Sequence, residues 1–181
     1  HFDSLDGSGG TNGRIDATVG WKPTVVNYQN SMHVYYYDQQ NGKLRHAWSD
    51  NNGNNWQFEI LDGNGGANGR ISSNTGQTPA SVVQGSDMFV FYHDVSGGDL
   101  RQAKWDGLLQ SWSFQTLDGT SDSPGKYNTN LGYEPFAITY GTSLQLYYYD
   151  STNGNLRHAW KVGNLWNFEN LDGDPGSIGR Y

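Results

Sequence analysis

Short runs of apolar residues, separated by turns rich in Asn and Gly, recur along the whole chain. In the first unit these runs cover residues 23–28, 32–37, 43–49 and 56–61. They are rich in the β-branched and aromatic residues that favour strands. The segments between them contain Asn and Gly, which accept the positive φ of tight hairpin turns. Because no segment has a sustained helical period, the pattern predicts an all-β protein built of four-stranded units.

The same unit is written three times along the chain. LRHAW, LRQAK and LRHAW place Arg45, Arg101 and Arg157 at a constant step of 56 residues, and LDG recurs at residues 5, 61, 117 and 171. Four strands in a repeat of this length are typical of a β-propeller blade. We therefore expect one propeller or part-propeller domain, with a stub at residues 1–21 and blades at about 22–77, 78–133 and 134–181.

Both faces of the second predicted strand are apolar or aromatic. Val34 and Tyr36 lie on one face, and Tyr35 and Tyr37 on the other, as expected for blades that pack face to face. Three blades do not close a ring, because known propellers need at least four. We expect either self-association, most simply as a homodimer with a ring of about six blades, or a longer propeller of which this chain is a part. The stub supplies a spare fourth strand at residues 2–5 that could cover a sheet edge.

Composition excludes several classes of function. Eighteen acidic residues against eleven Lys and Arg give a net charge of −7, which argues against nucleic acids and anionic membranes as partners. No apolar run is long enough to predict membrane insertion. The chain contains no Cys, and its five His lack metal-ligand spacing, so we expect no metal and no cofactor. It begins with His1 rather than Met, as a processed chain would.

The run VYYYDQQNGKLRHAW, followed by NW, resembles the blades of secreted sugar-binding propellers, the fungal six-bladed and bacterial seven-bladed fucose-binding lectins. The likeness spans all three repeats and implies a secreted, extracellular lectin with glycan partners and several inter-blade sugar sites. The fungal lectins carry an acidic residue after the third-strand Arg and an Arg on the second strand, where this chain has His46 and His33. The resemblance therefore implies no particular sugar. SDNNGNNW at residues 49–56 also resembles the Asp box of sialidase-like propellers, a fold-stabilising turn, with Asn51 replacing the Asp.

The third strand carries the candidate site. Alternation places His46 and Trp48 on one face and Arg45 on the other, so a groove between blades would combine one blade's His and Trp with its neighbour's Arg face. Trp can stack on the C–H face of a pyranose, while Arg and His hydrogen-bond hydroxyls. The candidate ligand-binding residues are Tyr37, Arg45, His46, Trp48, Arg101, Tyr149, Arg157, His158 and Trp160.

Blade packing is the alternative role for each candidate. The arginines occur in every copy and could pair with Asp38, Asp94 and Asp150. The His–Trp pairs are better functional candidates, because the middle copy replaces them with Gln102 and Lys104. A groove lined by those two residues should bind ligand less well or not at all.

The LDG loops suggest a structural turn. Each Asp is followed eight residues later by a cation, and this spacing predicts a turn pinned by an ion pair; a Ca²⁺ site is the alternative. The four cations are Arg14, Arg70, Lys126 and Arg180.

The residues give little sign of catalysis. Glu59 and Glu169 occupy equivalent positions, and Gln115 replaces them in the middle copy, which favours an outer-strand surface over an acid/base pair. We therefore expect no enzyme and no catalytic residue. The favoured function is a lectin-like carbohydrate-binding module, and the alternative is a non-catalytic assembly unit or an ancillary domain of a secreted hydrolase.

Overall fold

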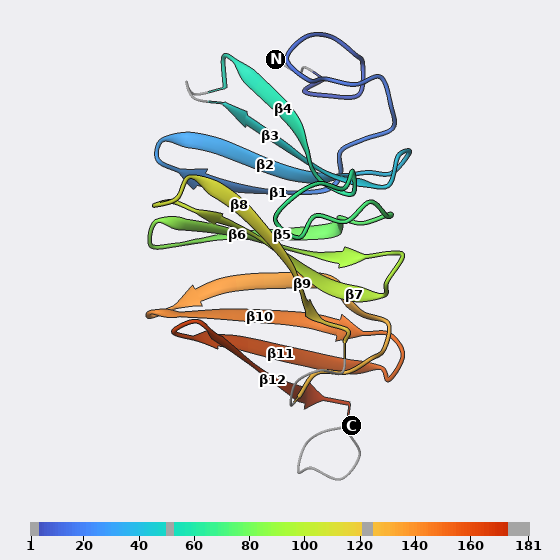
Figure 1. The fold of residues 1–181 in the computed structure, drawn as a ribbon, viewed down its shortest axis with the longest axis vertical. Helices are drawn as coiled ribbons and strands as arrows, with labels where there is room; N and C mark the ends of the chain where they lie inside the picture. Colours follow the sequence, from blue (N-terminus) through green and yellow to red (C-terminus); the bar gives the residue numbers. More distant parts are fainter. Residues whose placement is uncertain (1–3, 50–52, 121–124, 174–181) are drawn as a thin grey trace.

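Alternating side chains and Gly-containing turns produce three antiparallel four-stranded sheets, stacked one on the next (Figure 1). The computed structural model describes residues 4–49, 53–120 and 125–173. Within each sheet the strands pair in sequence order, as blades of a propeller-type fold do. The all-β prediction of three four-stranded units is confirmed. No helix occurs in the described residues, so none of them forms a helix able to span a membrane.

Each blade consists of four consecutive strands. The first blade contains β1 (Trp21–Tyr28), β2 (Ser31–Asp38), β3 (Lys43–Ser49) and β4 (Trp56–Asp62). The second contains β5 (Gln77–Gln84), β6 (Asp87–Asp94), β7 (Asp99–Asp106) and β8 (Ser111–Asp118). The third contains β9 (Leu131–Tyr140), β10 (Ser143–Asp150), β11 (Asn155–Val162) and β12 (Leu165–Asp172).

The first strands of the three blades, β1, β5 and β9, meet along one side of the stack. Each contains a bulge where a non-glycine residue precedes Pro and adopts positive φ: Lys22 at 51°, Thr78 at 50° and Glu134 at 44°. Pro cannot donate to a sheet ladder, and a bulge is one of the few places in a strand that accept it. Lys22 Nζ bonds Glu134 Oε1 at 3.1 Å and so links the first blade to the third. These residues and their prolines line a hollow of about 270 Å³.

The faces of the blades form the hydrophobic core. Tyr35 and Leu44 of the first blade pack against Val90 and Tyr92 of the second. The opposite face of the second blade packs in the same way against the third, with Phe89, Phe91 and Leu100 contacting Leu144, Leu146 and Tyr148. The apolar pattern on both faces of the second strand therefore has the face-to-face role expected of it.

The N-terminal segment, residues 4–20, covers the outer face of the first blade. Leu5 and Val19 pack against Tyr36, Ala47 and Phe58 there. The predicted stub strand at residues 2–5 lies mostly outside the described residues, and Ser4 and Leu5 are not in a strand. A stack of three blades has two end faces, and in the described residues this segment covers one of them.

Within residues 4–49, 53–120 and 125–173, no segment covers the outer face of the third blade, which we call the open face. Leu44 and Leu100 are fully buried, whereas the equivalent Leu156 is 42% exposed. Tyr140 is 80% exposed on the same blade. Equivalent residues are buried in the first two blades because another blade covers them. The outer face of the third blade is therefore equivalent to the faces that pack between blades, but no blade covers it among the described residues.

Candidate functional site

A cavity of about 330 Å³ opens between the first and second blades. We call it the aromatic groove. The first blade contributes His33, His46, Trp48 and Glu59, and the second contributes Met88, Trp105 and Trp112. The groove thus brings the predicted His46 and Trp48 together with a neighbouring blade, as the alternation along the third strand indicated.

Strand register places these side chains. His46 is the cross-strand partner of Glu59, and Trp48 is the partner of His33. On the facing blade, Trp105 pairs with Trp112 across β7 and β8. Cross-strand partners project from the same face of a sheet, so each blade presents a continuous patch to the groove.

A chain of polar contacts runs along the first-blade wall. Glu59 Oε1 lies 2.9 Å from His46 Nδ1, and His46 Nε2 lies 3.0 Å from His33 Nδ1. A carboxylate only accepts hydrogen bonds, so the Nδ1–H of His46 donates to Glu59, and Nε2 of the neutral ring accepts from His33. Burial lowers the pKa of His46, and Glu59 offsets part of that effect. At neutral pH the His46–Glu59 pair therefore keeps the negative charge of the carboxylate.

The aromatic rings of the groove stand at different angles. His46 stacks on Tyr35 with centroids 4.6 Å apart and on Trp48 at 4.9 Å. Trp112 meets His46 edge-on, with 75° between the ring planes, and Trp105 is tilted by 59° from Trp112. The Glu59 side chain is 36% exposed beside them. The groove can therefore offer flat apolar faces and hydrogen-bonding groups to one ligand.

The third blade repeats one wall of the groove. His158 Nδ1 lies 2.9 Å from Glu169 Oε1, and the ring stacks on Trp160 with centroids 5.1 Å apart. These residues line a hollow of about 570 Å³ with Tyr140 and Tyr147. The hollow lies on the open face, so no indole of a following blade faces it among the described residues.

The position between the second and third blades that corresponds to the aromatic groove, which we call the middle groove, has different chemistry. Lys104 stands where the first blade has Trp48, and its ammonium bonds Asp87 at 2.9 Å and Asp106 at 3.1 Å. Lys161 of the third blade lies over the Phe89 ring, 5.2 Å from its centroid. Two lysines thus come together where the aromatic groove has indoles. Weaker ligand binding in this groove remains a prediction.

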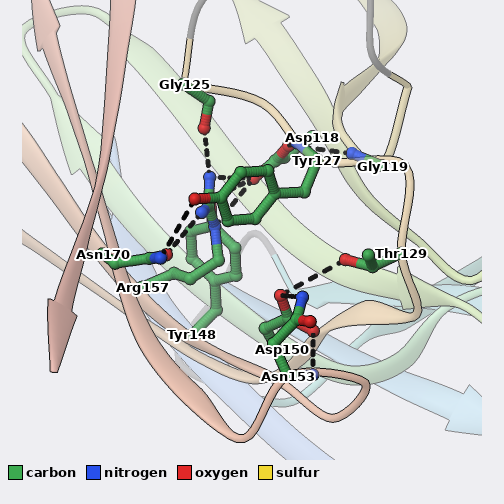
Figure 2. A network of polar contacts seen from close by, with 10 residues as sticks. All are labelled: Asp118, Gly119, Gly125, Tyr127, Thr129, Tyr148, Asp150, Asn153, Arg157 and Asn170. Carbon is green, nitrogen blue, oxygen red and sulfur yellow. Dashed lines mark hydrogen bonds and ion pairs between the residues drawn. The ribbon is translucent and has the colours of Figure 1, made fainter. Parts of the chain in front are cut away.

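The predicted arginines lie in buried ion pairs between consecutive units. Arg157 bonds Asp118 Oδ2 at 2.9 Å, and Asn170 Oδ1 and the carbonyl of Gly125 also accept from it (Figure 2). Tyr148 donates to the same Asp118 oxygen. We call this arrangement the arginine latch.

The other two latches join Arg45 Nε to Asp6 at 3.0 Å and Arg101 Nε to Asp62 at 3.2 Å.

The ion pairs of the arginine latches differ from those that the sequence predicted. Pairing with Asp38, Asp94 and Asp150 was wrong, because each Arg binds the LDG Asp of the preceding unit. Asp38 instead accepts from the backbone N–H of Asn41 at 2.9 Å within its own turn, and Asp150 likewise accepts from Asn153 (Figure 2).

The predicted ion pair within the LDG loop was also wrong. Asp6 Oδ1 accepts the backbone N–H groups of Gly7 and Ile15, both at 2.9 Å, while Oδ2 is held by the latch. Arg14 lies over the Phe58 ring instead. Arg70 and Lys126 behave similarly, lying over Phe114 and Phe168, and Arg180 lies outside the described residues.

Within the described ranges, no group of three His, Cys, Asp or Glu could hold a metal ion.

The two predicted tyrosines lie outside the aromatic groove. Tyr37 is buried and donates to Asn74 Oδ1 at 2.7 Å, and Tyr149 is exposed on the third blade. Of the predicted residues, the groove therefore joins His46 with Trp48, and the open face joins His158 with Trp160.

Sequence reasoning missed Trp105, which stands where the other repeats have Ser49 and Lys161. That departure from the repeat was the available signal.

Comparison with known proteins identifies the fold. No protein-family model and no curated protein sequence matches the chain. Among solved structures, it resembles the catalytic domain of a GH62 α-L-arabinofuranosidase from Coprinopsis cinerea, with a TM-score of 0.59 and 17% identity over 94% of this chain and 55% of that one. It also resembles a family 117 glycoside hydrolase from Zobellia galactanivorans, with a TM-score of 0.55 and 16% identity over 94% and 61% of the two chains.

A third similar structure is a NanB sialidase variant from Streptococcus pneumoniae. Its TM-score is 0.54, with 14% identity over 82% of this chain and 23% of that one. The chain thus spans less than two thirds of the length of each of these proteins. They support a propeller-type fold but not the resemblance to fucose-binding lectins. The expectation that the chain is not an enzyme is contradicted, because proteins that share its fold include glycoside hydrolases.

Proposed function

We propose that the chain is the saccharide-binding part of a carbohydrate-active β-propeller, and that the aromatic groove is its sugar site. One observation carries this proposal: His46 and Trp48 of one blade face Trp105 and Trp112 of the next across a cavity of about 330 Å³. Indole faces stack on the C–H side of sugar rings. The His33–His46–Glu59 chain supplies acceptors and donors for hydroxyl groups at the same place.

The size and composition of the groove suit a short saccharide. Ligand sites in proteins are concave, mostly apolar and equipped with a few fixed polar groups. The hydrogen bonds of His46 on both ring nitrogens fix its orientation before any ligand arrives, and pre-organisation of this kind lowers the cost of binding. The fold of two glycoside hydrolases and a sialidase also favours a carbohydrate ligand, and such a ligand favours an extracellular setting.

Self-association remains part of the proposal. Exposed apolar patches of the kind present on the third blade usually mark an interaction surface. A second copy that pairs through this face would make a symmetric homodimer and would bury Leu156 and Tyr140. Several sugar sites in one assembly would then raise the apparent affinity through effective concentration.

Glycoside hydrolysis is the second candidate function, favoured by the shared fold. Most glycosidases use two carboxyl groups on either side of the scissile bond. Among the described residues that line the aromatic groove, Glu59 is the one carboxylate. Hydrolysis in this groove would therefore need a second carboxyl group from outside the described lining.

A glycan array followed by product analysis separates the two functions. The wild-type chain should retain at least one class of glycan, and Trp48→Ala should lose that binding. Trp160→Ala is the matched control, because it removes the equivalent indole from the open face and should leave groove binding intact. Retention of full binding by Trp48→Ala would reject the groove as the site. Release of shorter sugars from the bound glycan would establish hydrolysis.

A further inference from the structure

The charge of the aromatic groove is one-sided. Its lining includes Glu59 and contains no Lys or Arg among the described residues. The neutral His46 does not compensate the carboxylate, because burial lowers the pKa of that imidazole. Arg45 and Arg101, on the same strands as groove residues, are held in arginine latches elsewhere. A ligand in the groove therefore meets the Glu59 carboxylate and no Lys or Arg from the described lining.

The indoles add to this preference. The faces of aromatic rings carry negative electrostatic potential, and Trp attracts cations more strongly than Tyr or Phe does. Trp48 and Trp105 are both partly exposed in the lining, whereas Trp112 is buried against His46 and Trp105, so a small cation can approach the first two indoles. Aromatic rings grouped around a cation are a general solution for binding ammonium groups.

The other two surfaces of the same type lack this combination. The middle groove contains Lys104 and Lys161, and the proximity of Lys104 helps burial to lower the pKa of Lys161. The open face has Glu169 and Trp160 but no facing blade among the described residues. The chain therefore contains two sites for comparison. The middle groove is cationic, and the open face has the equivalent of only one side of the aromatic groove.

We infer that the aromatic groove selects saccharides that carry a protonated amine, namely amino sugars with a free ammonium group, over neutral and acidic sugars. This inference rests on the proposed function, since it specifies the ligand of the same site. The ammonium group would bond the Glu59 carboxylate while the sugar ring stacks on an indole. A charge-assisted hydrogen bond is about twice as strong as a neutral one, and this difference produces the selectivity.

Isothermal titration with four matched trisaccharides tests the inference. The probes are the β-1,4-linked glucosamine trimer, its N-acetylated form, the β-1,4-linked glucose trimer and a galacturonic acid trimer. At low salt the glucosamine trimer should bind about tenfold more tightly than the two neutral trimers. The acidic trimer should bind most weakly. High salt should reduce the advantage of the amine because ions screen the partly exposed Glu59.

Glu59→Gln isolates the charge. Glutamine keeps the size of the side chain and an oxygen acceptor for His46, so it should bring the glucosamine trimer to the affinity of the neutral trimers. Binding of the glucose trimer should change by less than about twofold. Glu169→Gln is the matched control on the open face and should leave all four affinities unchanged. If Glu59→Gln lowers the thermal midpoint, the amine and N-acetyl forms compared on the wild type decide the question.

The outcomes distinguish this inference from the function on which it depends. Equal affinity for amine and neutral trimers, or a preference that survives in Glu59→Gln, would overturn the inference and leave saccharide binding intact. Tightest binding of the acidic trimer would do the same. Failure of every saccharide to bind, on the array and in titration, would reject both proposals.

Discussion

At the scale of single residues, differences between equivalent positions separate scaffold from candidate site. Arg45, Arg101 and Arg157 agree in all three repeats and occupy the same buried latch. Trp48 and Lys104 differ at one equivalent position, and they line grooves of different character. The arginine common to every blade thus joins consecutive units, whereas the third-strand position that varies between Trp48 and Lys104 changes the chemistry between blades.

Removing a latch arginine should destabilise the chain strongly. Arg101→Ala leaves the Asp62 carboxylate buried without its cation, and breaking a buried pair in this way costs about 3–5 kcal/mol. Lys22→Ala removes an exposed ion pair with Glu134 and should cost about 0–1 kcal/mol. Urea unfolding measures both changes. Equal losses in the two variants would show that the latch does not hold the blades together.

Mildly acidic conditions should weaken the fold through its buried histidines. Burial lowers the pKa of His46 and His93, so these rings bind protons in the unfolded chain before they do in the folded one. Their contribution to stability is complete above about pH 6.5 and is lost as the pH falls from there toward the folded pKa values. Unfolding free energies should therefore decrease over that window.

His93→Gln is the variant that checks this pH dependence. Its side-chain amide can still donate to Leu131 O, as His93 Nδ1 does, but it does not titrate. The difference between wild type and variant should shrink as the pH falls below about 6.5. The comparison is needed because burial and Asp94 raise the pKa of Asp99, which acts with the opposite sign at lower pH. A constant difference would contradict the account.

At the scale of elements, the loops after β4 and β8 each join their blade to the next. In the loop after β4, Gly69 has φ +87°, and its carbonyl accepts from Arg101 at 2.7 Å. A Cβ added at Gly69 would lie 2.1 Å from the carbonyl oxygen of Phe114. The loop therefore requires glycine for its backbone conformation and for its close approach to β8.

Gly69→Ala should destabilise the chain more than Gly85→Ala does. Gly85 also has positive φ, at 60°, but no atom lies within 4 Å of its added Cβ. The control therefore measures the conformational cost alone, about 1–2 kcal/mol, and Gly69→Ala adds a backbone clash. Thermal unfolding of both variants tests the difference. Equal shifts in Tm would mean that the loop is not closely packed on β8.

The repeat made the elements predictable but not their partners. Strand residues, turns and face-to-face packing follow from local patterns that occur three times. The latch was missed because Asp62 and Arg101 are 39 residues apart in the chain and belong to different units, whereas Asp94 lies closer in sequence. Trp105 was missed because it breaks the repeat. The covering of the first blade by residues 4–20 depends on tertiary packing that the stub sequence alone does not fix.

At the scale of the whole molecule, the third blade leaves an apolar face exposed. Phe136, Tyr140 and Leu156 are all exposed there, although equivalents of Leu156 are buried in the other blades. We expect the chain to pair through this face at micromolar concentration. Leu156→Glu should shift the native mass toward the monomer, and Val25→Glu, on an exposed position of the first blade, should not. A folded wild-type monomer at these concentrations would contradict the homodimer.

The central claim is that the aromatic groove holds a saccharide, and a crystal structure of the chain with its tightest-binding glycan tests it most directly. We expect a sugar ring stacked on Trp48 or Trp105, with a polar group near Glu59. The lysine-containing middle groove should be empty. A sugar seated instead in the hollow around Lys22 and Glu134, with the aromatic groove empty, would contradict the account.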